Sequence, residues 1–168
     1  MEWTGARYSD SPTVEVSTWI DAPIQRVWDV ASDIDEMARS SEELLRVEWT
    51  DGSHGPRLGA RFIGYNRHTS LGEWSTVSEI VEYEPRAVFA WAVGDPGNPS
   101  ATWRLRMAPE AGGTRLWSWV QMGPAPSGLS LAIAAMPDKE EKIVFVRMRE
   151  FETGMLASLR HLKRRSED

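Results

Sequence analysis

The three histidines of this chain do not have the spacing of a metal site. His54 lies in a loop rich in Gly and Pro, His68 falls at the end of a predicted hairpin strand, and His161 lies off the apolar helix stripe near the C-terminus. Zinc ligands usually come as closely spaced pairs. The chain also has no cysteine, which excludes a thiol nucleophile and a thiolate metal site. We therefore expect no metal and no cofactor.

The carboxylates do not form a catalytic pair that the sequence can identify. Glu42-Glu43 and Glu140-Glu141 are adjacent residues whose side chains diverge, as on solvated faces. Glu73 and Glu79 are six residues apart on one predicted strand, so they share a face, but it is the face opposite Trp74. The nucleotide-binding glycine motifs and the G-x-S-x-G elbow are absent. Whether the chain is an enzyme stays open.

Length and charge narrow the classes of protein. A chain of 168 residues suits one domain, and a net charge of −6 with a pI of about 5.2 argues against nucleic-acid binding. No apolar stretch reaches the length of a membrane span. Residues 1–12 lack the apolar run of a signal peptide and are expected to form a mobile tail before a single domain over 13–168. A cytoplasmic location is expected.

The N-terminal part of the domain predicts a strand followed by two short helices. Apolar and polar residues alternate over 14–20, which is typical of a half-buried strand. Asp21 offers an N-cap oxygen and Pro23 suits a first helical turn. An apolar stripe at helical spacing then includes Val27 and Trp28, and a second short helix is expected over 34–39.

The middle of the chain predicts an antiparallel meander. Short turns separate the expected strands, which favours pairing between sequence neighbours. The segment over 123–137 is apolar but punctuated by prolines, and we interpret it as a loop that is either a lid or a cover on the core edge. The expected strands are 45–49 (with Leu45, Val47 and Trp49 on one face), 61–68, 73–83, 88–93, 102–107 and 114–122.

The C-terminal residues 138–165 predict one long helix of about seven turns, roughly 40 Å. Asp138 and Glu141 have the spacing of a capping box. Gly154 lies beside the apolar stripe, where it either makes room for a ligand or permits a close helix–strand contact. The stripe itself consists of Val144, Met148, Phe151, Met155, Leu159 and Leu162.

The order of strand, two short helices, six strands and long helix resembles the START/Bet v 1-like (SRPBCC) superfamily. Its polyketide cyclase/dehydrase-like branch is the most similar. The likeness covers residues 13–163. It is carried by Ile20-Asp21-Ala22-Pro23, Val27-Trp28, Asp33, Gly59-Ala60-Arg61-Phe62-Ile63-Gly64, Asn66-Arg67, Trp74, Thr76, Pro85, Phe89-Ala90-Trp91, Trp103 and Gly113-Thr114-Arg115.

The resemblance implies an α+β helix-grip fold, in which a seven-stranded antiparallel sheet wraps around the long C-terminal helix and encloses a cavity. Polar side chains able to orient a ligand would be Asn66 and Thr76, whereas Ser118 is interpreted as making an ordinary strand hydrogen bond. Strand alternation shows which residues share a face, and the resemblance implies which face points inward. The expected ligand-binding residues are then Phe62, Asn66, Trp74, Thr76, Phe89, Trp91, Trp103, Met148, Phe151 and Met155.

Two functions follow from the resemblance. The first is binding of a hydrophobic or aromatic small molecule, as a carrier or as a polyketide cyclase/dehydrase-like enzyme. The alternative is a protein-interaction or co-chaperone role with an incidental cavity. Tryptophans that point inward favour a ligand, and an outward cluster favours a partner.

Three of the nine tryptophans have the phase of the opposite sheet face. Trp19, Trp117 and Trp119 lie on the first and last strands, which are expected to be neighbours, so they should cluster on the convex surface. An exposed apolar patch usually marks an interface, and a homodimer is the commonest solution. The alternative is that long arginine side chains cover the indoles.

Overall fold

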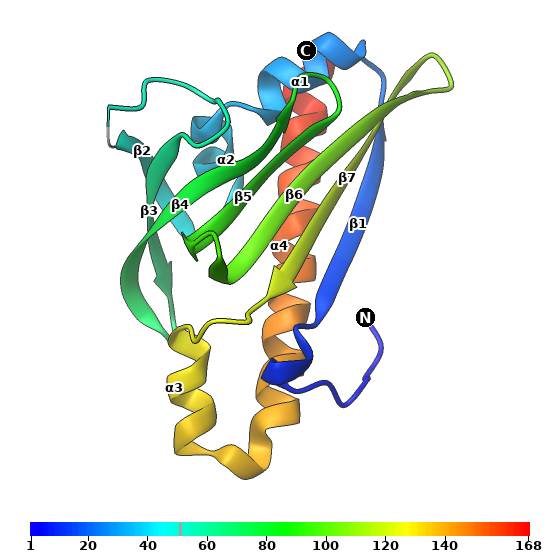
Figure 1. The fold of residues 1–168 in the computed structure, drawn as a ribbon. Coiled ribbons are helices and arrows are strands. Elements are labelled where there is room, and N and C mark those ends of the chain that lie inside the picture. The colour runs from blue at the N-terminus through cyan, green and yellow to red at the C-terminus, as the bar shows by residue number, and fades with distance from the viewer. Residues whose placement is uncertain (51) are drawn as a thin grey trace.

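The computed structural model describes residues 1–50 and 52–168. Asp51, part of the turn expected after the second strand, lies outside them. The described residues form an α+β fold around one antiparallel sheet (Figure 1). Its strands are β1 (Thr13–Ile20), β2 (Leu44–Thr50), β3 (Arg61–His68), β4 (Gly72–Glu84), β5 (Val88–Asp95), β6 (Asn98–Glu110) and β7 (Gly113–Met122).

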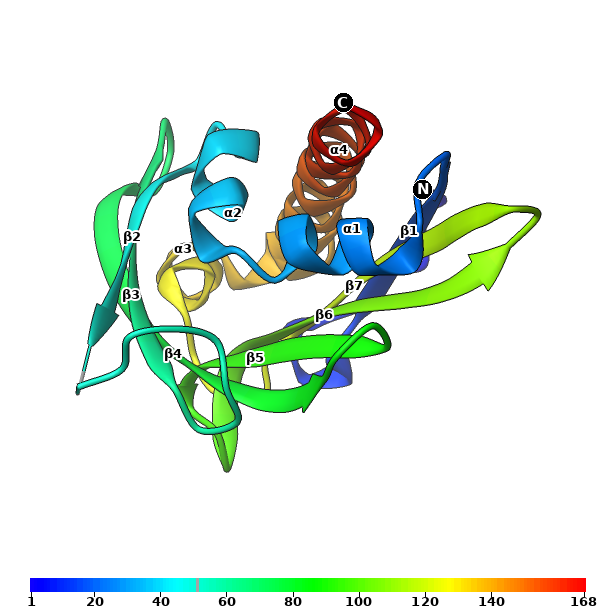
Figure 2. The ribbon, with the colours of Figure 1, turned by 90° about the horizontal axis from the view of Figure 1, so that it is seen from above.

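The sheet has seven strands in the order β1-β7-β6-β5-β4-β3-β2, so the first and last strands are neighbours, as expected. It curves around the long helix α4 (Glu140–Glu167). The short helices α1 (Ile24–Ala31) and α2 (Ile34–Ser40) lie on the same side of the sheet as α4 (Figure 2). This is the helix-grip fold that the family resemblance implied.

The apolar stripe of α4 faces the sheet. Five of its six residues are buried and Phe151 is half-buried. The start of this helix differs from the prediction, because α4 has no side-chain cap and follows a separate turn of 3-10 helix over Pro137–Lys139. The capping box at Asp138 was therefore wrong. The buried members of the stripe are Val144, Met148, Met155, Leu159 and Leu162.

The segment expected to be a loop between β7 and α4 contains a helix, α3 (Gly128–Ala135). Its start is capped by Ser127, whose Oγ accepts a hydrogen bond from the Leu129 N–H at 3.3 Å. The residues of this helix are apolar on nearly every side, with Ser130 as the polar exception, so it lacks the polar face by which amphipathic helices are recognised. The flanking prolines concealed it further.

Two local predictions about the N-terminal half were wrong. Leu45 is 47% exposed, because a bulge between Leu44 and Arg46 turns Leu44 inward instead. The N-cap of α1 is Pro23, with no side-chain hydrogen bond, and Asp21 instead donates its backbone N–H to Glu167 Oε1 at 2.8 Å.

The N-terminal segment over 1–12 lies against α4 and the β7–α3 connection. Tyr8 lies in a turn of 3-10 helix and donates its hydroxyl to the Ala125 carbonyl oxygen at 2.7 Å. The Trp3 ring meets the Phe145 ring edge-on, with centroids 5.1 Å apart. These contacts place the segment beside the domain, and its mobility stays a prediction.

Candidate functional site: a cavity between the sheet and α4

A cavity of about 220 Å³ lies between the concave face of the sheet and α4, with α2 along one side. Strands β3 to β7 supply slightly less than half of the lining residues, because every second residue of each strand points inward. Helices α1, α2 and α4 and the connection from α2 into β2 supply the rest. An apolar cavity of about 150 Å³ can hold benzene in another protein. The present cavity therefore suits a ligand of one or two fused rings.

Most of the expected ligand-binding residues line this cavity. The strand residues come from the predicted inward faces, and the helix residues come from the middle of α4. Gly154 also lines it, and a Cβ atom built there would meet nothing within 4 Å, so this glycine makes room in the cavity. The expected residues in the wall are Phe62, Asn66, Thr76, Trp91, Trp103, Phe151 and Met155.

Three expected residues lie elsewhere. Phe89 is fully buried in the core behind the wall, where its ring contacts those of Trp28 and Trp91. Met148 is 2% exposed and packs in a second core cluster nearer the start of α4. Trp74 pairs with Asn66 on the inward face, but it lies beyond the lining residues towards the strand end.

Aromatic rings form a continuous array along the wall. Trp91 and Trp103 are register partners on β5 and β6 and stack with centroids 6.4 Å apart and planes inclined by 11°. Phe62 meets Trp91 at 6.4 Å, and Phe151 of α4 meets Trp103 at 5.1 Å, both edge-on. Such pairs stabilise one another beyond their burial. The array presents flat apolar surface to the cavity.

The side of the cavity formed by α2, the start of β2 and α4 carries a polar strip among its apolar residues, and the sequence did not predict it. On α4, Glu150, Gly154 and Ser158 line the cavity at spacings of four residues, so they share one face of the helix. Facing them are Ser40 and Glu43, and the Ser40 and Ser158 hydroxyls are 3.1 Å apart. In the sequence, Glu150 and Ser158 already form a polar stripe beside the apolar stripe of α4. Apolar spacing alone does not reveal that this polar stripe faces a cavity.

A buried arginine holds the two cavity carboxylates together. Arg147 donates from Nη1 to Glu43 Oε2 and Glu150 Oε2, both at 2.9 Å, and from Nη2 to Glu43 Oε1 at 2.6 Å. Its guanidinium also covers the Phe151 ring at 4.6 Å. Burial alone would lower the pKa of Arg147, but its hydrogen bonds to the two carboxylates raise that pKa above its ordinary value.

The cavity wall also carries hydroxyls that are free to bind a ligand. Within the described chain, the side chains of Thr76, Ser78 and Ser118 make no hydrogen bond, although all three line the cavity. Ser118 therefore does not make the strand hydrogen bond that we expected. Asn66 donates weakly to the Gly64 carbonyl oxygen, at 3.4 Å, which leaves its own amide oxygen available.

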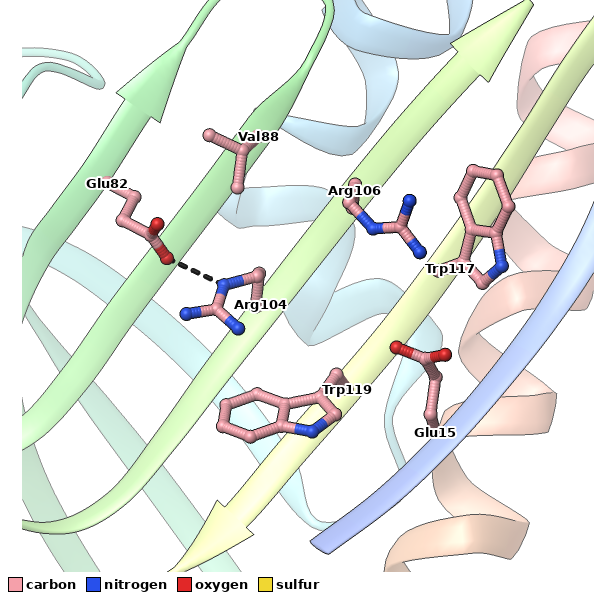
Figure 3. Close-up of a pocket in the computed structure, with 7 residues that line it drawn as sticks. All are labelled: Glu15, Glu82, Val88, Arg104, Arg106, Trp117 and Trp119. Carbon is pink, nitrogen blue, oxygen red and sulfur yellow. Dashed lines mark hydrogen bonds and ion pairs between the residues drawn. The ribbon is translucent and has the colours of Figure 1, made fainter.

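The outer face of the sheet carries the tryptophans of the expected interface. Arg104 lies over Trp119 at 4.7 Å and Arg106 lies over Trp117 at 4.1 Å, and these four side chains line a shallow hollow (Figure 3). Trp19 donates its indole N–H to a backbone oxygen at 2.8 Å. All three indoles are half-buried. Arginines cover Trp117 and Trp119, as the alternative stated, whereas the cation over Trp19 is Lys163, at 5.3 Å from the ring centroid, and Trp19 does not line the hollow.

Residues 1–50 and 52–168 show neither a metal-binding cluster nor a membrane-spanning helix. These residues contain no group of three or more His, Asp or Glu side chains arranged to hold a metal ion. Within the same ranges, no helix combines the length and hydropathy needed to cross a bilayer.

Fold and site together define a helix-grip protein with an internal cavity that has an aromatic array along its wall and a polar strip where α2 meets α4. The model of the family described as "Polyketide cyclase / dehydrase and lipid transport" matches residues 11–167, so the chain belongs to this family. No protein of curated function matches the sequence significantly.

Solved structures agree with this assignment. A polyketide-cyclase-like protein from Corynebacterium glutamicum is 30% identical, with a TM-score of 0.64 over 90% of this chain and 89% of that chain. The Zhui aromatase/cyclase from Streptomyces sp. R1128 is 17% identical, with a TM-score of 0.66 and 93% of both chains covered. The di-domain ARO/CYC StfQ of the steffimycin pathway is 14% identical, with a TM-score of 0.69 over 92% of this chain and 50% of that one. The last two likenesses show the fold alone.

Proposed function

We propose that this protein binds a flat, hydrophobic small molecule with one or two fused aromatic rings in the cavity between the sheet and α4. The observation that carries the proposal is the aromatic array formed by Phe62, Trp91, Trp103 and Phe151 along the cavity wall. Ligand sites are typically apolar clefts with a few placed polar groups. The hydroxyls of Thr76 and Ser118 and the amide of Asn66 supply such groups.

A cyclase- or dehydrase-like reaction on such a molecule is the second candidate. It is supported by the family and by the names of two structural neighbours. A role in protein interaction alone fits less well, because Trp91 and Trp103 line the cavity. A homodimer through the outer face and a cytoplasmic location stay predictions.

Native mass spectrometry of the purified protein tests the proposal first, by detecting a small molecule that stays bound. A titration with the neutral probe N-phenyl-1-naphthylamine should quench tryptophan fluorescence and saturate at one probe per chain. Gly154→Leu should abolish this saturation by filling the cavity, whereas Thr153→Leu, at the exposed neighbouring position, should not. Quenching that never saturates, or that is equal in both variants, would overturn the proposal.

A further inference from the structure

We infer that the cavity selects aromatic molecules that carry a hydroxyl group and discriminates against aromatic carboxylates. The inference rests on the proposed function and specifies the chemical class of the ligand. It follows from the charge and hydrogen-bonding capacity of the polar side of the cavity, where Glu43 and Glu150 lie.

The side chains in the cavity wall include two carboxylates and no cation. Among the described lining residues, Glu43 and Glu150 are the charged groups, and none is Lys, Arg or His. Apolar cavities that bind carboxylic acids need a cation or a set of donors to compensate the ligand's charge. An aromatic carboxylate entering this cavity would instead approach two groups of its own charge.

The nearest cation, Arg147, is already committed. Its guanidinium bonds to both carboxylates, its side chain is 9% exposed, and it does not line the cavity. One guanidinium leaves a net charge of −1 on these three groups. His68, whose Nε2 lies 3.1 Å from Glu150 Oε2, contacts the same carboxylate and does not line the cavity. A ligand carboxylate could reach Arg147 only by displacing Glu43 or Glu150, which would leave that carboxylate without its partner.

Glu150 is the group best placed to accept a hydrogen bond from a ligand. Its Oε2 atom already receives the Arg147 Nη1 donor at 2.9 Å and lies 3.1 Å from His68 Nε2. Its Oε1 atom has no hydrogen bond within the described chain. One turn further along α4, Gly154 leaves open space beside it. A hydroxyl on a ring stacked against the aromatic wall would find this acceptor at the polar side.

Two ligands of nearly equal size, one with a hydroxyl and one with a carboxylate, test whether the cavity prefers the hydroxyl. At pH 7, 2-naphthol is neutral, because phenolic pKa values lie near about 10, whereas 2-naphthoic acid is ionised. Isothermal titration calorimetry on the intact chain should show 2-naphthol binding at least about tenfold more tightly than 2-naphthoate, since like charges repel in a partly buried site. Naphthalene, which lacks the hydroxyl, should bind more weakly than 2-naphthol.

The variant Glu150→Gln keeps the shape of the side chain and removes its charge. It should raise the affinity for 2-naphthoate by about tenfold and so reduce the discrimination, because one of two repelling charges is gone. The matched control is Glu73→Gln, which makes the same change of net charge on the outer face, where Glu73 pairs with Arg67. This control should leave the affinity ratio unchanged.

Equal affinity of the native chain for 2-naphthol and 2-naphthoate would overturn the inference and leave the proposed function standing. An equal response to Glu150→Gln and Glu73→Gln would also overturn it, because the effect would then come from overall charge. If none of the three naphthalene compounds binds, the proposed function itself fails. If Glu150→Gln does not fold, the ratio of the native chain's affinities for 2-naphthol and 2-naphthoate still decides the question.

Discussion

Trp91 and Trp103 stand opposite each other on β5 and β6 and stack almost in parallel, with ring centroids 6.4 Å apart. Both indoles line the cavity, whereas Trp28 of α1 is 5% exposed and packs against Tyr83 and Phe89 in the core. The chain therefore contains tryptophans in two different surroundings, one beside empty space and one enclosed.

This difference predicts unequal costs of truncation. Trp28→Ala should lower the free energy of unfolding by about 3–5 kcal/mol, because it opens a void in a filled core. Trp91→Ala should cost less, about 1–2 kcal/mol, since one side of this ring already lacks contacts. Urea unfolding measures both values. Equal destabilisation, together with unchanged probe binding by Trp91→Ala, would show that Trp91 is ordinary core.

Replacing Gly154 by alanine should stabilise the protein. Gly154→Ala should raise the free energy of unfolding by about 0.5–1 kcal/mol, because alanine restricts the unfolded chain and favours the helix. The new methyl group has open space around it, so no packing penalty offsets this gain. Thermal or urea denaturation tests the change. A loss of stability would mean that the glycine is required for the path of α4.

Glu36 predicts a loss of stability in acid. Its side chain is 4% exposed, and its Oε2 lies 2.6 Å from His161 Nε2. Burial alone would raise the pKa of Glu36, but hydrogen bonds from His161, Arg39 and Arg165 lower that pKa from 4.5 to about 2. Because the folded pKa lies below the unfolded one, the stabilisation is complete above about pH 4.5 and disappears as the pH falls towards 2.

The measurement is a series of urea midpoints between pH 6 and pH 2. The native chain should lose stability over this window more steeply than Glu36→Gln, which has no carboxyl group to protonate. The variant should be less stable than the native chain at pH 6 and approach it near pH 2. Parallel curves for the two proteins would show that Glu36 does not contribute to the acid sensitivity.

The tryptophans on the outer face of the sheet lead to a prediction about the oligomeric state. If Trp117 and Trp119 form part of a two-fold interface, analytical ultracentrifugation should find a dimer at micromolar concentration, and Trp117→Ser should shift it towards monomer. Arg104 and Arg106 already cover these rings in the single chain. A monomer that Trp117→Ser leaves unchanged would show that the arginines alone account for the cluster.

The sequence best predicted which side chains share a face in strands that bury only one face, because there the alternation of apolar and polar residues is regular. Alternation along β3 and β5 correctly grouped the residues that share a face with Phe62 and Trp91, and the family resemblance indicated that this face points inward. The grouping holds because in a sheet covered on one side a shift of one residue would expose the apolar set. The bulge at Leu44 defeated the same reasoning in β2, since one extra residue reverses the alternation.

The polar side of the cavity was harder to predict because it comes from residues distant in the chain. Glu43 and Glu150 are brought together by Arg147, which lies on α4 but off its apolar stripe. Their charges resemble those of a solvated helix face when the sequence is read alone. Only the packing of α2 and β2 beside α4 shows that these carboxylates border a cavity.

The sheet does not close on itself, because β1 and β2 are its two edges. On the β2 side, α2 completes the wall, contacting both β2 and α4. Between α2 and α4 the connections are side-chain contacts, including Glu36 with His161 and Ser40 with Ser158. The wall formed by the sheet is thus held by backbone hydrogen bonds between strands, whereas the wall formed by α2 is held to α4 by side-chain contacts alone. A displacement of α2 would widen the cavity without breaking any strand pairing, so substitutions in this seven-residue helix could alter the size of the accepted ligand while leaving the sheet intact.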